Sequence, residues 1–234
     1  MVKLSVNINK IATLRNARGG NIPNLDFFTD AIINFGADGI TIHPRPDERH
    51  IKIHDVYSIN KVINNRVEFN IEGYPSRKFI DMVLKVHPTQ VTLVPDPPNV
   101  LTSLAGWDTI QHKEFLYDII KELQKSGIRT SIFVHPDIKM IQGSADINAD
   151  RVELFTGLYA NASSCIDSYI QCSQYASNLG LDVNAGHDLD LNNLTFFIKK
   201  MSFLKEVSIG HALISESLIL GLEETIRRYK KILS

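Results

Sequence analysis

The chain has 234 residues, of which 44% are hydrophobic and 22% charged, a composition typical of a soluble globular protein. Its formal net charge of −1 gives no general attraction to nucleic acid or to an anionic membrane, so we expect neither partner. No apolar run approaches the roughly 18 residues of a membrane-spanning helix. The N-terminus also lacks the apolar stretch of a signal peptide, which favours a cytoplasmic location.

Eight short apolar runs alternate with helix-like stretches along the chain. We expect strands at Leu4–Ile8, Gly39–His43, Val67–Glu72, Gln90–Val94, Arg129–His135, Arg151–Thr156, Leu181–Asn184 and Glu206–Gly210. Eight such units without a dividing linker favour an α/β fold, a single (β/α)8 TIM barrel domain with extra helices over residues 1–234. A doubly wound open sheet is the structural alternative, which the lack of a Gly-rich turn after the first strand disfavours.

The stretches between these strands predict helices and one long loop. The loop is expected from Thr13 to Asn24, where polar residues, Arg and Gly gather. Asn24 would cap the next helix, which carries Phe27 on its apolar face and ends at Gly36. Further helices are expected at His54–Asn64, Pro75–Val86, His112–Lys125, Ile138–Ile147, Ser164–Leu179, Asn192–Met201 and Ser215–Leu233.

Three acid/base candidates, His43, Glu72 and His187, fall at the ends of expected strands. In a (β/α)8 barrel those ends form the mouth that carries the active site. Histidine titrates near neutral pH, and a carboxyl at the mouth of an apolar barrel is partly desolvated, which raises its pKa. Each residue alone is as well explained by a structural hydrogen bond, but three at matching positions favour acid/base catalysis.

Cationic side chains gather in the loops after the first two strands. They are Lys10, Arg15, Arg18, Arg45, Arg49 and His50. Arginine forks bind phosphate oxygens in pairs, although solvated surface positions are the alternative for Arg15 and Arg49. Gly210 and His211 follow the eighth strand, and barrels commonly bind phosphate after strands seven and eight. Two separate anion sites predict two phosphorylated ligands, or one bisphosphate.

Common metal and nucleotide motifs are missing from the sequence. It contains no P-loop, no His-Glu-x-x-His and no Cys-x-x-Cys, so we expect no metal site. His87, His112 and His135 are interpreted as structural or surface residues.

Five stretches of the chain resemble the pyridoxine 5′-phosphate synthase family of vitamin B6 biosynthesis. They are residues 4–19, 36–51, 69–73, 183–187 and 209–212, which follow one another over nearly the whole chain. The resemblance implies a (β/α)8 barrel that assembles as a homo-octamer and acts on small-molecule phosphorylated substrates. It implies condensation of 1-deoxy-D-xylulose 5-phosphate with 3-amino-2-oxopropyl phosphate to pyridoxine 5′-phosphate, phosphate and water, without metal or organic cofactor.

The resemblance also implies roles for individual residues. His43 would be a general base, Glu72 a second acid/base group and His187 the general acid. The amino-ketone phosphate would be held by Asn7, Arg18, Gly210 and His211, and the deoxyxylulose phosphate by Arg45, His50 and Thr102. Substrate binding is also expected of Asn9, Lys10 and Asp188, where the chain departs from many family members, which carry Asp-His and Gly there. The segment Pro95–Gly106 is the candidate lid.

Other functions remain as alternatives. A sugar-phosphate isomerase or aldolase would need one phosphate site and one base. A Schiff-base role of Lys10 in the synthase reaction is disfavoured, because the amine substrate can itself form the imine. A phosphatase-like metal hydrolase fits less well. A barrel that binds phosphorylated metabolites or scaffolds an assembly without turnover is the non-enzymatic alternative, which Asn9 and Lys10 keep open.

Overall fold

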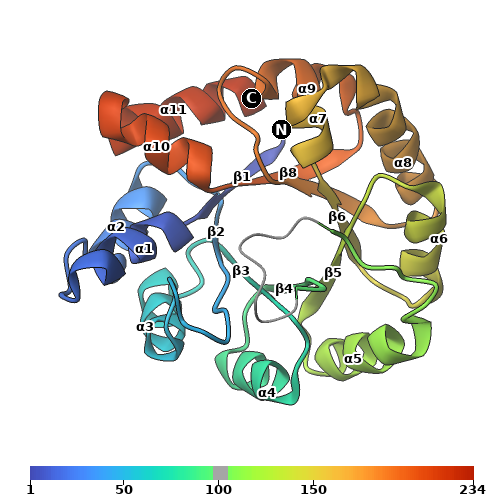
Figure 1. Cartoon of the computed structure of the whole chain (residues 1–234), viewed down its shortest axis with the longest axis horizontal. Helices are drawn as coiled ribbons and strands as arrows, with labels where there is room; N and C mark the ends of the chain where they lie inside the picture. The colour runs from blue at the N-terminus through green and yellow to red at the C-terminus, as the bar shows by residue number, and fades with distance from the viewer. Residues whose placement is uncertain (97–104) are drawn as a thin grey trace.

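A computed structural model describes residues 1–96 and 105–234. Its eight parallel strands form a closed barrel in the order β1 to β8, with helices around it (Figure 1). The strands are β1 (Lys3–Asn7), β2 (Gly39–Ile42), β3 (Glu68–Gly73), β4 (Gln90–Leu93), β5 (Arg129–Val134), β6 (Arg151–Phe155), β7 (Asp182–Gly186) and β8 (Leu204–Ile209). The predicted (β/α)8 barrel is confirmed, and the open sheet is excluded because β1 pairs with β8.

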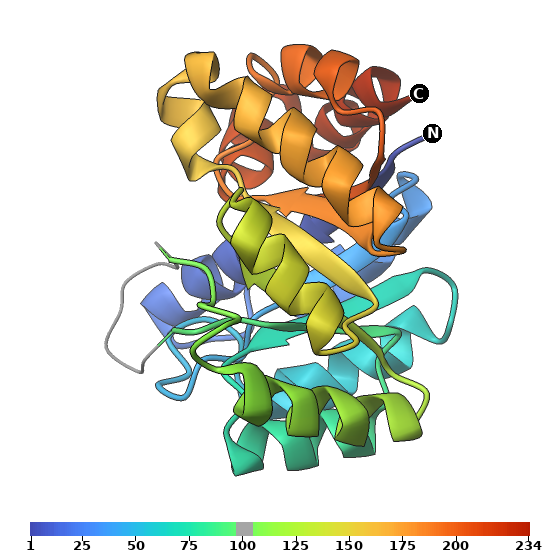
Figure 2. The same cartoon turned by 90° about the vertical axis from the view of Figure 1, so that its right-hand side faces the viewer.

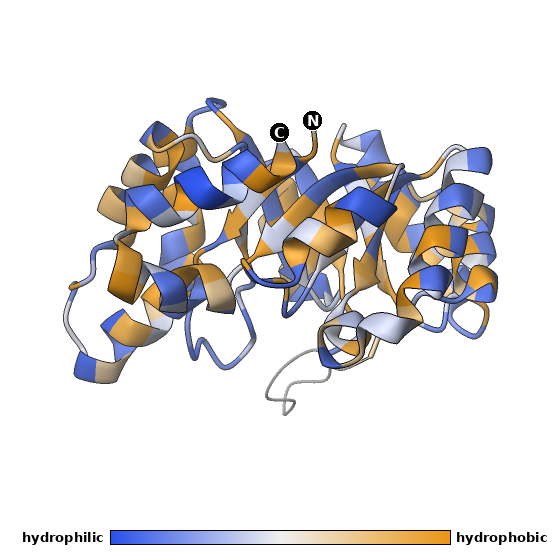
Figure 3. Cartoon of the chain, turned by 90° about the horizontal axis from the view of Figure 1, so that it is seen from above, coloured by the Kyte–Doolittle hydropathy of each residue, from blue (hydrophilic) through white to orange (hydrophobic). Residues whose placement is uncertain are grey.

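The helices cover the outside of the barrel (Figure 2). They are α1 (Asn9–Arg18), α2 (Leu25–Asn34), α3 (Ile53–Ile63), α4 (Arg77–Val86), α5 (Lys113–Lys125), α6 (Ile138–Asp146), α7 (Gly157–Asn161), α8 (Ile166–Asn178), α9 (Leu194–Lys200), α10 (His211–Leu220) and α11 (Leu222–Leu233), with the 3-10 turn η1 (Ser163–Cys165). Hydrophobic and hydrophilic residues alternate along them, as helices with one buried face require (Figure 3). Among the described residues, no helix is long and apolar enough to cross a membrane.

Local sequence explains where α4 begins and which face it buries. The Ser76 side chain accepts a hydrogen bond from the Phe79 N–H, which is the standard way to satisfy a free donor at a helix start. Phe79, Met82 and Val83 recur at helical spacing and are buried against the barrel. Other helices follow the same pattern, so their positions agree with the predicted ones to within a few residues.

Two of the predicted segments differ from the structure. The predicted loop from Thr13 to Asn24 is helical as far as Arg18, because Arg15 is a buried side chain of α1 and not part of a solvated loop. The predicted helix from Ser215 to Leu233 begins at His211 and is divided at Gly221, whose φ of 83° interrupts the helical backbone.

Phe27 on α2 is exposed rather than buried. Its side chain is 68% exposed, although Asn24 caps the helix through the Phe27 N–H as predicted. The buried positions of α2 are Leu25, Thr29 and Ile32. The face of α2 that points away from the barrel therefore carries a large apolar group.

The interior of the barrel is polar, which corrects our expectation of an apolar barrel. Successive residues of a strand point to opposite faces, and the apolar ones pack against the helices. On the other face, Ser5 and Thr41 share a hydrogen bond of 2.7 Å, and Thr92 donates one of 3.0 Å to Asn70. The strands are thus joined across the barrel interior by side-chain hydrogen bonds.

Two buried carboxyls lie in this interior, Glu153 on β6 and Glu206 on β8. Burial, and next the neighbouring Glu206, raise the pKa of Glu153 to about 8. Burial raises the pKa of Glu206 to about 7, against the opposing effect of Arg151. The barrel therefore retains protons on buried carboxyls near neutral pH, because an ionised carboxylate is costly to desolvate.

This protonation predicts how stability depends on pH. The folded protein keeps the Glu153 proton up to about pH 8, whereas the unfolded chain releases it near the ordinary carboxyl value of about 4.3. Wild-type stability should therefore fall as pH rises between these two values. Glu153→Gln stays uncharged, so its Tm relative to wild type should be at least about 3 °C higher at high pH than at low pH.

Thermal unfolding followed by circular dichroism at about pH 5 and about pH 8 tests this. Asp118→Asn, an exposed change on α5, is the control and should shift Tm equally at both values. A Tm difference between Glu153→Gln and wild type that does not change with pH would show that Glu153 is ionised in the folded protein.

Candidate active site

The three acid/base candidates meet at the mouth of the barrel. His43 directly follows β2, Glu72 lies at the end of β3 and His187 directly follows β7. Nδ1 of His43 lies 3.8 Å from Oε2 of Glu72. The positive charge of a protonated His187 would lower the pKa of His43. The structure thus brings together the residues to which the sequence analysis gave catalytic roles.

His43 and Glu72 are both held in their uncharged forms. Burial, and then the positive charge of Arg45, lower the pKa of His43 well below its ordinary value. Burial, and then the neighbouring carboxyls of Glu153 and Asp96, raise the pKa of Glu72 well above its ordinary value. Both shifts favour a neutral imidazole beside a protonated carboxyl over an ion pair at this 3.8 Å contact. Near neutral pH the mouth holds one proton acceptor beside one donor.

His187 is fixed by aromatic packing and by an unusual backbone. Its ring centroid lies 4.9 Å from that of Phe133 and 5.4 Å from that of Phe155. Its φ is 82° and that of Asp188 is 57°, a region that favours glycine and that Asp tolerates better than most residues. Burial lowers the pKa of His187, while the negative charges of Asp188 and Asp96 oppose this shift.

Asn7 and Asn9 form contacts within the protein. The Asn9 N–H donates to Oδ1 of Asn7 at 3.0 Å, and the His43 N–H donates to Oδ1 of Asn9 at 3.0 Å. Asn9 thereby ties the start of α1 to the residue that follows β2. A Cβ atom at Gly210 would lie 3.1 Å from the Asn7 Cβ, so glycine allows the ends of β1 and β8 to approach closely.

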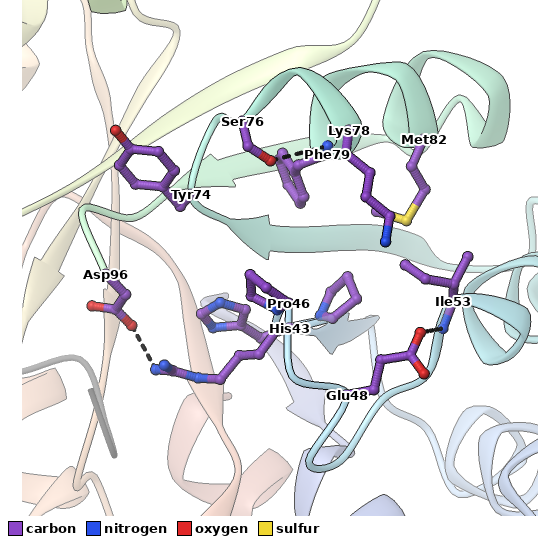
Figure 4. A pocket seen from close by; sticks show the side chains of 12 residues that line it. His43, Pro46, Glu48, Ile53, Tyr74, Ser76, Lys78, Phe79, Met82 and Asp96 are labelled. Atoms are coloured by element: carbon purple, nitrogen blue, oxygen red, sulfur yellow. Dashed lines mark hydrogen bonds and ion pairs between the residues drawn. The ribbon is translucent and has the colours of Figure 1, made fainter. Parts of the chain in front are cut away.

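A pocket opens beside His43, between the loop after β2 and the start of α4 (Figure 4). Its lining residues are His43, Pro44, Arg45, Pro46, Glu48, Ile53, Tyr74, Ser76, Lys78, Phe79, Met82 and Asp96. Nη2 of Arg45 donates to Oδ2 of Asp96 at 2.6 Å in a buried ion pair. Figure 4 shows the Lys78 side chain extending from α4 into this pocket. The pocket therefore contains two cationic side chains from different elements, Arg45 after β2 and Lys78 on α4, together with the carboxyls of Asp96 and Glu48.

Of the other predicted cations, His50 lies beside His43, whereas Lys10 and Arg18 lie on α1. The His50 ring is half-buried, with its centroid 6.2 Å from that of His43. Lys10 and Arg18 are exposed on α1. Arg18 ends that helix, roughly 14 Å along its axis from Asn9, so the structure does not bring it to His43 and Glu72. Within the described part of the chain, neither Lys10 nor Arg18 forms a side-chain hydrogen bond or ion pair.

The loop after β8 leads directly into a helix start. Gly210 is the N-cap of α10 and His211 is its first residue, about one turn earlier than the helix start predicted at Ser215. The free N–H groups of this first turn form the kind of site that binds phosphate. Residues 97–104 of the predicted lid, which include Thr102, lie outside the described part of the chain.

The sequence analysis overlooked four side chains at or near the site. Asp96, in the Pro-Asp-Pro sequence after β4, pairs with Arg45, and Glu153 lies between apolar residues in the middle of β6. Lys78 lines the pocket. His135, which we interpreted as structural or surface, follows β5 with its ring 5.4 Å from that of Phe155. An ionisable residue at the end of a strand was the available signal for Asp96 and His135.

The described residues contain no cluster of three or more His, Cys, Asp or Glu side chains that could hold a metal ion. The donors at the mouth are instead imidazole, carboxyl and guanidinium groups placed singly on different strands. Such an arrangement moves protons and binds anions.

The position of Asn9 predicts what substitutions there will do. Asn9→Asp keeps an oxygen acceptor for the His43 N–H and should leave kcat within about tenfold of wild type. Asn9→Leu removes the acceptor, leaves that N–H without a partner and lets His43 shift, so kcat should fall at least about tenfold more than in Asn9→Asp. Steady-state kinetics of both variants measures this.

Asn60→Leu is the matched control for this comparison. Asn60 donates to the Val86 carbonyl at 3.1 Å, between α3 and the end of α4 and away from the mouth. This variant should lose stability and keep its kcat. Equal kcat values for Asn9→Leu and Asn9→Asp would show that the contact does not position His43.

Three relatives that match this chain over nearly its full length carry the same name. The chain is 55% identical over 238 residues to the pyridoxine 5′-phosphate synthase of Christiangramia forsetii, with 100% of both chains covered. It is 56% identical over 238 residues to the protein of the same name from Bacteroides fragilis, again over 100% of both. The Cytophaga hutchinsonii protein of that name is 55% identical over 234 residues, which cover 98% of each chain.

Solved structures with lower identity share the fold. A mutant tryptophan synthase alpha-subunit from Pyrococcus furiosus has a TM-score of 0.66 at 14% identity, covering 99% of this chain and 97% of that one. A phosphoribosyl anthranilate isomerase in complex with a reduced deoxyribulose 5-phosphate compound has a TM-score of 0.60 at 13% identity, covering 99% and 100%. Residues 4–234 match the family described as Pyridoxal phosphate biosynthesis protein PdxJ, and the chain belongs to this family.

Proposed function

We propose that this chain is a pyridoxine 5′-phosphate synthase, which joins 1-deoxy-D-xylulose 5-phosphate to 3-amino-2-oxopropyl phosphate and forms a ring by general acid/base catalysis. Its full-length relatives carry this name, and His43, Glu72 and His187, from three of the stretches that suggested the family, follow or end strands at one mouth. The observation that carries the mechanism is the neutral His43 beside the protonated Glu72. As the resemblance implies, the proposal includes no metal and no organic cofactor.

The acid/base roles follow from the state of each group. Condensation of an amine with a ketone and the later dehydrations each need a proton removed at one atom and delivered at another. Neutral His43 accepts a proton from the substrate, and the protonated carboxyl of Glu72 donates one. His187 acts as the general acid once a bound phosphate dianion has raised its pKa, since an anion nearby favours the imidazolium form.

Two anion sites are assigned to the two phosphate esters. The amino-ketone phosphate is assigned to the start of α10, with Gly210, His211 and Asn7, because the helix start supplies N–H donors beside the end of β1. Arg18 belongs to this set by resemblance, although its side chain is exposed at the far end of α1.

The deoxyxylulose phosphate is assigned to the pocket side of the mouth, where Arg45 and His50 lie near His43. Thr102 completes this set by resemblance. Lys10 and Asp188 are assigned to substrate binding at the rim of the mouth, where both side chains are exposed. Asn9 contributes chiefly through its hydrogen bond to the backbone of His43.

The proposal predicts turnover with both substrates and loss of turnover without His43. Protein purified in the presence of a chelator should form pyridoxine 5′-phosphate and release phosphate in parallel. His43→Ala should lower kcat by at least about a hundredfold, the usual contribution of a general base, with an unchanged circular dichroism spectrum. Glu72→Gln should have an effect of similar size, because an amide cannot donate and accept the same proton.

His87→Asn is the control for the histidine substitution. His87 is exposed at the end of α4 with a φ of 56°, a backbone conformation that Asn also tolerates. This variant should keep wild-type rates. A folded wild-type protein that is stabilised by both phosphates yet forms no product would favour the alternative of a barrel that binds metabolites without turnover.

We also propose that the chain forms a homo-oligomer, an octamer as the resemblance implies. Large apolar side chains are exposed on neighbouring helices at one side of the molecule, where α1, α2 and α10 lie together (Figure 1). Leu218 and Ile219 of α10 are 78% and 89% exposed, and Phe27 of α2 is 68% exposed. Gathered groups of this kind are typical of surfaces that are covered by a second copy.

Light scattering after size-exclusion chromatography tests this assembly. The wild-type mass should be about eight times the 26.3 kDa of one chain. Ile219→Asp should lower the mass, because a charge in an apolar interface is costly. Phe196→Asp, a substitution of an exposed aromatic residue on α9, should keep the wild-type mass. A monomeric wild-type protein would contradict the proposal.

A further inference from the structure

Arg15 has neither of the roles that the sequence analysis considered. It is not a solvated surface cation, since it is 4% exposed, and its guanidinium is paired with a carboxylate of the chain itself. Nη1 donates to Oδ1 of Asp55 at 2.6 Å, and Nη2 donates to Oδ2 at 2.8 Å. This forked, buried pair links α1 to the first turn of α3 across 40 residues of sequence.

The same group of side chains holds the backbone just before α3. The His50 carbonyl accepts from Nδ2 of Asn16 at 2.8 Å and from Nη2 of Arg15 at 3.4 Å. Two residues further on, the Lys52 N–H donates to Oδ2 of Asp55 at 2.8 Å. Arg15, Asn16 and Asp55, which we call the clamp, therefore fix the peptide groups on both sides of residue 51.

This backbone fixes the imidazole of His50. The Ile51 N–H donates to Nδ1 of His50 at 3.0 Å, so Nδ1 is an acceptor and the ring proton lies on Nε2. Burial, and then the positive charges of Arg45 and Arg49, lower the pKa of His50 to about 4. Near neutral pH the ring is uncharged, and its remaining polar atom is a single N–H donor on the side away from the backbone.

We propose that the clamp is a positioning device that presents the Nε2–H of His50 to the phosphate of the deoxyxylulose substrate. The identity of that ligand rests on the proposed function. The clamp acts through the backbone: it holds the His50 carbonyl and the Lys52 N–H, and the Ile51 N–H between them sets the tautomer and direction of the ring. Arg15 does not contact the substrate and is a positioning residue.

The positioning role needs the two parallel hydrogen bonds of the Arg15 guanidinium, and a positive charge alone would not supply them. A buried ion pair adds little net stability compared with apolar side chains of the same size. Its planar, two-bond geometry, however, sets both the distance and the angle between two elements. A lysine in place of Arg15 would keep the charge and offer no rigid fork, so it separates positioning from charge balance.

Steady-state kinetics of Arg15→Lys tests the proposal. The KM for deoxyxylulose phosphate should rise at least about fivefold, while kcat and the KM for the amino-ketone stay within about twofold. Asn16→Ala, which removes the shorter bond to the His50 carbonyl, should give the same pattern with a smaller rise. It serves as the second variant if Arg15→Lys does not fold.

A double-mutant cycle shows whether the clamp works through His50. In a His50→Ala background, Arg15→Lys should change this KM by less than about twofold, because its target is gone. Arg129→Lys is the matched control: Arg129 forms an ion pair with Glu68 at the other end of the barrel, and its KM values should be unchanged. Equal rises from Arg15→Lys with and without His50 would overturn the proposal.

Nitrogen NMR of histidine-labelled protein gives a readout that needs no substrate. Wild-type His50 should show one protonated and one unprotonated ring nitrogen, and in Arg15→Lys the two signals should move toward each other as the tautomers mix. If wild type makes no product and the spectra change in this way, the proposed function fails while the clamp stands. If wild type is active and neither KM nor the spectra change, the clamp fails.

Discussion

Closure of the sheet between β1 and β8 is the constraint on which the rest of the molecule depends. The parallel pairing runs from Lys3 opposite Glu206 to Val6 opposite Ile209. Because the sheet has no edge, the C-terminal ends of all strands form one ring, and the loops that follow them face a common centre. Residues far apart in sequence, such as His43 and His187, are neighbours for this reason alone.

Within that ring, the first helix organises the loop after the second strand. Asn9 at its start holds the backbone of His43, and Arg15 and Asn16 near its end hold the backbone of His50. Helix α1 therefore fixes the backbone at both ends of this loop. Side chains on a loop reach the precision that catalysis needs only when other groups fix the backbone beneath them.

Burial is the largest cause of the pKa shifts of the acid/base residues in the site. Desolvation disfavours both the imidazolium form of His43 and the carboxylate form of Glu72. Arg45 adds to the effect on His43, whereas at Glu72 it opposes the effect of the neighbouring carboxyls. Burial also raises the pKa of Glu153 in the polar interior below the mouth, so this carboxyl keeps its proton near neutral pH. A proton acceptor and donors are therefore present before substrates bind.

Much of the fold and the three acid/base candidates could be predicted from sequence, because both depend on local patterns. An apolar run that ends at His43 or His187 reports the end of a strand directly. The failures at Arg15 and Glu153 concern contacts made over long distances in sequence. Nothing near Arg15 indicates that Asp55 will neutralise it in the interior, so a polar stretch was mistaken for a loop. Likewise, Glu153 in an apolar run gives no sign that its side chain faces a polar barrel interior.

The protonation state of His43 in the free protein is the most direct test of this account. Histidine nitrogen spectra of labelled protein, recorded from about pH 5 to about pH 8, measure it without substrate. We predict that His43 titrates well below the ordinary histidine value and is neutral at the upper end of this range, because burial and the charge of Arg45 lower its pKa. A His43 that titrates at or above about 6.5, the ordinary histidine value, would mean that it forms an ion pair with an ionised Glu72, and would contradict the account.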